Sequence, residues 1–200
     1  MYAQNRYSVF LCLAALFVTS ELGPSGDFSS YAYAADPVIT EKFTPAPIQV
    51  PEGYEIQLAA ETPLVNHPTM ACLDDQGRLY VCENAGVNLS AADLEKELPN
   101  SISLLVDTDG DGKYDSSTVF ADKLTFPMGA TWYQGSLYVA SPPYIWKLTD
   151  HDGDGVAEDR QILVKHFGYT GNAASIHGCF LGPDGRIYWC DGYHGHDFED

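Results

Sequence analysis

Two acid-rich loops carry the clearest chemical pattern in this 200-residue chain. Each spaces carboxylates at positions 1, 3, 5 and 9 and has a glycine at position 6. The carboxylates are Asp107, Asp109, Asp111 and Asp115 in acidic loop 1 (107–115), and Asp150, Asp152, Asp154 and Glu158 in acidic loop 2 (150–158). Oxygen ligands at alternate positions suit Ca²⁺, because the chain must fold back to wrap the ion. The spacing predicts a calcium site in each loop.

Two features separate these loops from an EF-hand. Thr118 and Gln161 stand where a bidentate glutamate would complete the ligand set, and the flanking runs are typical of strands rather than helices. Three interpretations stay open: weak structural calcium sites, acid-rich turns that hold no ion, and a regulatory site.

The loops belong to a longer repeat whose copies lie 43 positions apart (150 minus 107). In both copies an apolar run precedes the loop and another follows it. A period of about 40 to 50 residues, with several short strands per unit, indicates the blades of a β-propeller. The fold class predicted is therefore all-β: a partial propeller of about two and a half blades of four-stranded antiparallel sheet, within 53–200.

Apolar runs bounded by Gly, Asp and Pro turns predict the strands. Blade one would span about 68–122, with strands near 70–73, 78–83, 101–106 and 118–121 and a short helix at 90–98 capped by Ser90. Blade two would span about 127–166, with strands near 129–133, 136–140, 144–148 and 161–165. Blade three begins at about 176 and has two strands. Such an open set cannot close a ring, so the sequence looks truncated.

A half-buried strand is predicted at 54–59, with Tyr54, Ile56 and Leu58 on one face. It precedes blade one and has no hairpin partner here. In a complete propeller it would finish the last blade and close the ring from the N-terminal side.

Residues 1–34 have the pattern of a secretory signal peptide. Arg6 supplies the positive charge, residues 8–18 are apolar, and Ala32-Tyr-Ala34 allows cleavage before Ala35. Residues 35–52, rich in proline, would form an extended linker. We expect an exported protein, periplasmic or associated with the cell envelope; a retained membrane anchor is the alternative.

A net charge of −18 argues against a nucleic-acid partner, because phosphate binding needs clustered Lys and Arg. Export would permit disulfides, but a four-residue turn would set Cys72 opposite about Leu79 and Cys179 opposite about Tyr188. Neither cysteine would then face Cys82 or Cys190, and the connectivity stays open. The chain has no Cys-x-x-Cys-His, so it carries no c-type haem site of its own.

His177 is the candidate catalytic residue. If the innermost strand of each blade comes first, His177 stands at the entrance to blade three, near the central channel, and the acidic loops lie on the opposite face. An imidazole there can act as a general base that accepts a hydroxyl proton. The alternative is a histidine hydrogen-bonded to a neighbouring loop, without chemistry. Glu83 and Asp191 leave second strands on the same face and are weak candidates for cofactor binding.

Two further histidines follow blade three's second strand. His194 and His196, alternate in an extended chain, point the same way and could hold a transition metal; a solvated loop is the simpler interpretation. His67, next to Pro68, is interpreted as a turn residue.

An ordered set of motifs resembles one known family. The motifs are Val50-Pro-Glu-Gly-Tyr-Glu-Ile-Gln-Leu-Ala-Ala60, Asp74-Asp-Gln-Gly-Arg-Leu-Tyr-Val81, Leu105-Val-Asp-Thr-Asp-Gly-Asp-Gly112, Val119-Phe-Ala-Asp122 and the run from His177 through Gly-Pro-Asp-Gly185 to Tyr188. Over about 40–200 the chain resembles the N-terminal propeller of the PVC-type membrane-bound dehydrogenases, which are related to the soluble quinoprotein glucose and sorbosone dehydrogenases.

The resemblance implies an oxidoreductase of the pyrroloquinoline quinone (PQQ) type that oxidises a sugar or alcohol and passes electrons to a c-type cytochrome domain, in a missing C-terminal part. The spacing after His177 is shorter here than in those quinoproteins. The isolated chain is expected to be inactive. The alternative function is a non-catalytic, calcium-stabilised propeller that binds carbohydrate or protein.

Overall fold

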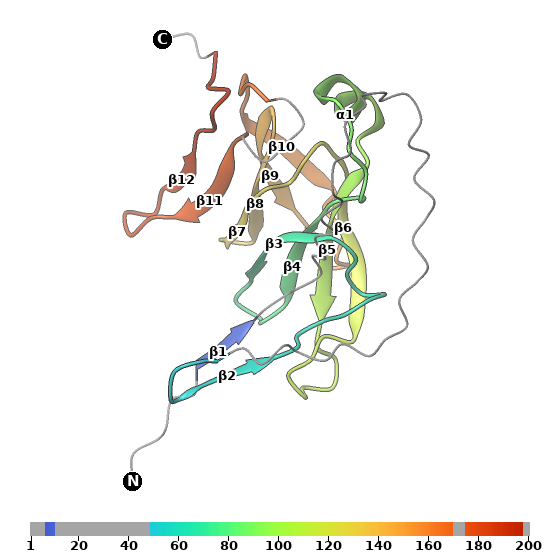
Figure 1. The fold of residues 1–200 in the computed structure, drawn as a ribbon, viewed down its shortest axis with the longest axis vertical. Helices are drawn as coiled ribbons and strands as arrows, with labels where there is room; N and C mark the ends of the chain where they lie inside the picture. The colour runs from blue at the N-terminus through green and yellow to red at the C-terminus, as the bar shows by residue number, and fades with distance from the viewer. Residues whose placement is uncertain (1–6, 11–48, 170–174, 198–200) are drawn as a thin grey trace, which may run out of the picture.

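The computed structural model describes residues 7–10, 49–169 and 175–197 (Figure 1). These residues are mostly β: two four-stranded antiparallel sheets, a hairpin, a two-stranded pair and one short helix. Among the described residues, no helix has the length and apolar character needed to cross a bilayer.

The first sheet has the strand order β3-β4-β5-β6, so each strand pairs with its neighbour in sequence. Its strands are β3 (Pro68–Leu73), β4 (Leu79–Glu83), β5 (Asn100–Val106) and β6 (Ser116–Leu124). All four strands predicted for this unit are confirmed, although β6 extends three residues further than expected.

The second sheet repeats this order as β7-β8-β9-β10. Its strands are β7 (Ala130–Tyr133), β8 (Ser136–Ser141), β9 (Tyr144–Thr149) and β10 (Asp159–Val164). The hairpin of β11 (His177–Leu181) and β12 (Ile187–Cys190) follows. These six strands are also confirmed.

The helix α1 (Ala91–Glu97) lies between β4 and β5, as predicted. The Ser90 hydroxyl caps it by accepting the Asp93 backbone N–H at 3.2 Å, which satisfies one of the free donors of the first turn. Leu98 ends it in the left-handed region, at φ 47°.

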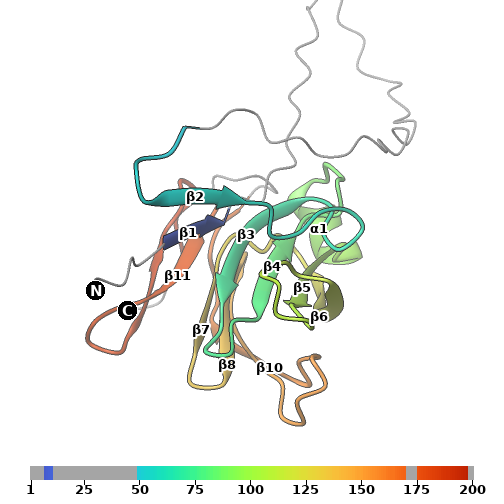
Figure 2. The same cartoon turned by 90° about the horizontal axis from the view of Figure 1, so that it is seen from below.

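The first strands of the three units are neighbours. β7 contacts both β3 and β11, and Figures 1 and 2 show β7 between these two strands. The described strands do not close a ring.

Because the strands are antiparallel, successive connections lie at alternate ends of each sheet. Acidic loops 1 and 2 join the third and fourth strands of their sheets, at the same end as the turns between first and second strands. His177 begins β11 at the opposite end, where α1 also lies (Figure 1).

The main core fills the space between the two sheets. Tyr80 and Phe120 are fully buried and meet edge to face, with ring centroids 4.8 Å apart. Tyr80 also stacks on Trp132 at 5.3 Å. Aromatic pairs of this kind add stability beyond the apolar area that they bury.

The strand predicted at 54–59 is confirmed in shorter form as β2 (Tyr54–Gln57), and among the described residues it has no hairpin partner. It pairs instead in parallel with β1 (Tyr7–Phe10), a pairing that the sequence did not predict. An open strand leaves backbone donors and acceptors unpaired, and β1 supplies partners for them. Apart from β1, the proposed signal segment 1–34 lies outside the described residues, as does most of the linker 35–52.

The four cysteines that the structure describes, Cys72, Cys82, Cys179 and Cys190, are free thiols. Cys72 stands opposite Tyr80, one residue from the predicted Leu79, and Cys82 stands opposite Met70. Cys179 lies at a register shift between the pairs Gly178–Trp189 and Phe180–Tyr188. The expectation that neither cysteine pair faces directly is therefore met.

Candidate functional site

Acidic loop 1 is held in shape by its own carboxylates. The two Asp107 oxygens accept the backbone N–H groups of Gly110 at 2.7 Å and Gly112 at 2.9 Å. Asp115 closes the loop by accepting the backbone N–H of Thr108 at 3.2 Å and its hydroxyl at 2.8 Å. Both glycines have positive φ (76° and 89°), which lets the chain turn back on itself without steric cost.

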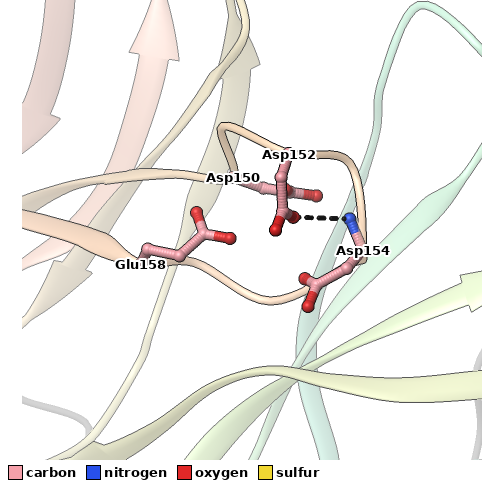
Figure 3. A group of neighbouring side chains, drawn as sticks. All are labelled: Asp150, Asp152, Asp154 and Glu158. Atoms are coloured by element: carbon pink, nitrogen blue, oxygen red, sulfur yellow. Dashed lines mark hydrogen bonds between the residues drawn. The ribbon is translucent and has the colours of Figure 1, made fainter.

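Acidic loop 2 has matching internal bonds. Asp150 accepts Gly153 N–H at 2.7 Å and Gly155 N–H at 3.0 Å. Asp152 accepts the N–H of Asp154 at 3.1 Å (Figure 3), and Glu158 accepts that of His151 at 2.9 Å. The repeated acids and glycines therefore give two loops of the same geometry.

The spread of the carboxylates fits a divalent cation. One oxygen each from Asp150, Asp152, Asp154 and Glu158 lie within 4.8 Å of one another, and Asp107, Asp109 and Asp115 form a like group. Two oxygens bound to one Ca²⁺ at about 2.4 Å can be at most about 4.8 Å apart. Asp111 was expected in the first ligand set but is outside this group; its carboxylate accepts the N–H of Lys113 at 2.8 Å.

The surroundings shift the pKa values of the loop carboxylates in different directions. Backbone donors, with Gly112 first, lower the pKa of Asp107, and the N–H of His151 lowers that of Glu158. The N–H of Asp154 also pulls the pKa of Asp152 down, but partial desolvation, the charges of Asp154 and Glu158 and a hydrogen bond with Glu158 outweigh it, so that pKa is raised. Crowding of negative charge in acidic loop 2 is the condition that a cation would relieve.

Each acidic loop is bonded to a segment outside its own sheet. Position 8 of each loop donates its backbone N–H: Tyr114 to the Ala59 carbonyl at 2.9 Å, and Ala157 to the Phe120 carbonyl at 2.8 Å. Tyr114 and Ala157 are both buried. Acidic loop 2 thus joins the second sheet to β6, the last strand of the first sheet.

The position-6 glycines give the same correspondence. A Cβ added at Gly155 would lie 3.6 Å from Thr118, two residues before Phe120. A Cβ added at Gly112 would find Gln57 as its nearest neighbour, at 3.9 Å, two residues before Ala59. Residues 57–59 therefore have the same position relative to acidic loop 1 that residues 118–120 have relative to acidic loop 2.

Arg160 reinforces the contact of acidic loop 2. Its guanidinium donates to the Asp122 carbonyl at 2.7 Å and to the Asp122 carboxylate at 3.0 Å. Arg160 is the main reason that the pKa of Asp122 is lowered. No local sequence pattern indicates this pair, because the residues lie 38 positions apart in different units.

At the other end of the sheets, His177 is half-buried and stands opposite Cys190. His196, which the sequence placed beside His194 as a candidate ligand, instead pairs with Asp191, with Nδ1 and Oδ2 at 2.5 Å. Bonds to 166–168 fix its segment: Gly168 N–H to the Gly195 carbonyl and Asp197 N–H to the His166 carbonyl, both 2.9 Å. The base role of His177 stays a prediction.

Glu83 is engaged by the protein itself. One carboxylate oxygen accepts the N–H of Asn66 at 2.7 Å, and the other accepts the Ser103 hydroxyl at 2.5 Å. These bonds tie the segment before β3 to β5. His67, predicted as a turn residue, lies in that segment and accepts the N–H of Asn84 with its carbonyl at 3.0 Å.

Comparison with known proteins identifies the family. No curated protein and no solved structure matches this chain. Residues 42–200 match the family described as Domain of unknown function (DUF7133). This range contains both sheets, both acidic loops and the β11–β12 hairpin, and the chain therefore belongs to the DUF7133 family.

Proposed function

We propose that the described sheets are blades of a partial β-propeller, and that the acidic loops bind Ca²⁺ and clamp each blade to the last strand of the blade before it. The observation that supports this most directly is the repeated backbone hydrogen bond from loop position 8: Tyr114 N–H to the Ala59 carbonyl, and Ala157 N–H to the Phe120 carbonyl. A cation at each loop would hold in place the backbone N–H that makes this contact.

The same correspondence supports the propeller arrangement. Ala59 accepts the position-8 N–H of acidic loop 1 as Phe120 accepts that of acidic loop 2, and Phe120 belongs to the outermost strand of a four-stranded sheet. By analogy, the segment around β2 is the outermost strand of a blade whose inner strands come from elsewhere. The side-by-side order of β3, β7 and β11, in which β7 contacts both others, is the one expected of the inner strands of neighbouring blades.

Calcium affinity is expected to be weak. Neither loop has a bidentate glutamate at position 12, and its carboxylates are largely exposed. Extracellular calcium modules typically bind with dissociation constants of roughly 10⁻⁴–10⁻³ M. An ion at ten times its dissociation constant would add about 1.4 kcal/mol per site to the free energy of unfolding.

The test is thermal unfolding of the full chain in a calcium titration, with magnesium as the control cation. We expect the midpoint to rise by several degrees as Ca²⁺ reaches the millimolar range and to change little with Mg²⁺, which demands a stricter octahedral shell. The double variant Asp152→Asn, Glu158→Gln should lose about half of the rise, because acidic loop 1 remains. No rise in the wild type would refute the calcium role.

A second candidate function follows from the other end of the sheets: an exported oxidoreductase of the quinoprotein dehydrogenase type, with His177 as base. The Asp191–His196 pair favours this function. It places a second imidazole and a carboxylate just after β12, and the last residue of β12, Cys190, stands opposite His177. PQQ, a sugar or alcohol substrate and a cytochrome partner would then belong to a longer protein. Dye reduction with added PQQ by that longer protein, lost in His177→Ala, tests this; activity retained in the variant would refute the base role.

A further inference from the structure

A pocket separate from both acidic loops and from His177 lies beside α1. It has a volume of about 330 Å³. Its walls come from three elements: Glu95 and Leu98 from α1 and its C-terminal cap, Lys123 from β6, and Tyr144 and Trp146 from β9. This volume is at the lower end of the roughly 300–1,000 Å³ typical of small-molecule pockets.

Buried hydrogen bonds hold the lining residue Thr125 against β5 and β8, behind the pocket. Asn100 donates its side-chain N–H to the Thr125 carbonyl, and its side-chain oxygen accepts the N–H of Ala85 at 2.7 Å. The Thr125 hydroxyl lies 2.9 Å from that of Ser141, which also accepts the N–H of Phe126 at 3.1 Å. Asn100, Thr125 and Ser141 are almost fully buried. A satisfied buried network of this kind makes a rigid, preorganised site.

Backbone strain marks the same place. The described chain has four non-glycine residues with positive φ, and two of them, Leu98 at 47° and Lys123 at 56°, line this pocket. Such conformations cost free energy for residues with a side chain and tend to be kept at functional sites. Lys123 adopts this conformation inside strand β6, where an extended backbone would be the default.

The pocket offers two charges of opposite sign and an aromatic corner. Glu95 and Lys123 are exposed, and they come from different walls. The Lys123 ammonium lies 3.6 Å from the Asp122 carboxylate in an exposed pair, which leaves donors of the ammonium for a ligand. The rings of Tyr144 and Trp146 meet edge to face at 5.3 Å, and both are half-buried. A carboxylate next to aromatic rings favours an ammonium group, which is also attracted to the ring faces. The Lys123 ammonium favours a carboxylate.

The overall charge narrows the ligand class. A net charge of −18 disfavours ligands with net negative charge. Lys123 inside the pocket disfavours simple cations. A molecule that carries one positive and one negative charge, and so has no net charge, can pair with both Glu95 and Lys123.

We propose that this pocket binds a small zwitterion, with its ammonium group between Glu95 and the Tyr144–Trp146 corner and its carboxylate at Lys123. The site is independent of calcium and of propeller closure, so it goes beyond the function proposed above.

The experiment uses the full chain and four ligands: glycine betaine, choline, acetate and D-glucose. Binding is followed by calorimetry and by tryptophan emission, to which Trp146 contributes. Betaine should bind, choline more weakly, and acetate and glucose should not. Glu95→Gln should weaken both betaine and choline by up to about fivefold, the size of one exposed ion pair, because a quaternary ammonium has no N–H to donate. Lys123→Gln should weaken betaine only.

Matched exposed residues outside the pocket provide the controls: Glu97→Gln on α1 and Lys165→Gln after β10 should leave all affinities unchanged. All four substitutions are at exposed positions, and circular dichroism checks that each variant is folded. Glucose binding as tightly as betaine would overturn the proposal, and so would a Lys123→Gln variant with an unchanged ratio of betaine to choline affinity. Absence of any betaine binding up to about 20 mM would also overturn it.

Discussion

The backbone N–H of Ala157 donates to the carbonyl of Phe120 at 2.8 Å, which joins acidic loop 2 of the second sheet to the outermost strand of the first. Near this bond, the Arg160 guanidinium donates hydrogen bonds to the carbonyl and the carboxylate of Asp122, and Gly155 lies close to Thr118 and Leu104. The contact between the sheets therefore includes a hydrogen-bonded clamp at one end, in addition to the aromatic core.

Replacing Arg160 by Met should lower the free energy of unfolding by about 1 kcal/mol, because the pair with Asp122 is partly exposed and has two good hydrogen bonds. Chemical denaturation measures it. A double-mutant cycle with Asp122→Asn isolates the coupling. Lys123→Ala is the control: its ammonium is 3.6 Å from Asp122 and exposed, so the change should be near zero. Equal losses in Arg160→Met and the control would contradict the clamp.

Phe120→Ala should cost about 3–5 kcal/mol, the usual range for removing a buried aromatic ring. Phe120 is fully buried against Tyr80, whereas its neighbour Val119 is 53% exposed. Val119→Ala should change stability by less than about 0.5 kcal/mol. If the two substitutions had similar effects, the assignment of β6's inward face would be wrong.

Gly129→Ala tests the close approach of the first strands. A Cβ at Gly129 would lie 1.8 Å from the Gly178 carbonyl oxygen, and neither backbone segment can move without shifting its strand. We expect a loss of more than about 3 kcal/mol or failure to fold. Gly153→Ala is the comparison: it has open space but φ of +82°, so only the conformational cost of about 1–2 kcal/mol applies. A milder effect at Gly129 than at Gly153 would contradict the packing of β7 against β11.

Much of this arrangement was predictable from the sequence. The alternating apolar residues and the turn signals predicted eleven of the described strands, β2 to β12, and α1, because local hydrophobic period and capping chemistry decide them. The acid spacing predicted the loops, and seven of the eight candidate ligand residues fall in the two carboxylate groups. The exception is Asp111, although it accepts the N–H of Lys113 at 2.8 Å just as Asp154 accepts that of Val156, so neither the spacing nor this bond explains the difference.

Contacts between distant segments were not predictable. The β1–β2 pairing, the Arg160–Asp122 clamp and the pocket beside α1 depend on how whole sheets pack. The Asp191–His196 pair depends on a loop that is fixed by residues 166–168. Local residue patterns carry no information on such partners.

Asp152→Asn should have opposite effects with and without calcium. Because the Asp152 pKa is raised in the folded state, its contribution to stability is present below the unfolded pKa and is lost as the pH rises through the folded pKa. At pH 7 without calcium the neutral amide should therefore raise the unfolding midpoint. With calcium the variant should gain less than the wild type. A variant destabilised in chelator would contradict the crowding of charge in acidic loop 2.

Asp107 should respond to pH in the reverse direction. Its folded pKa lies below the ordinary value of 3.8, so its contribution is present above the unfolded pKa and is lost as the pH falls through the folded pKa. Unfolding measured between about pH 5 and pH 2 should show a smaller loss of stability in Asp107→Asn than in the wild type. Parallel curves for the two proteins would contradict this role.

The most direct test of the central claim is amide hydrogen exchange at Tyr114 and Ala157, measured by NMR with chelator and with saturating Ca²⁺. If the ions clamp each blade to the strand before it, exchange at both amides should slow by about tenfold per 1.4 kcal/mol of added stability, more than at the Leu137 amide in β8. Unchanged exchange at Tyr114 and Ala157, with calcium bound, would contradict the clamp.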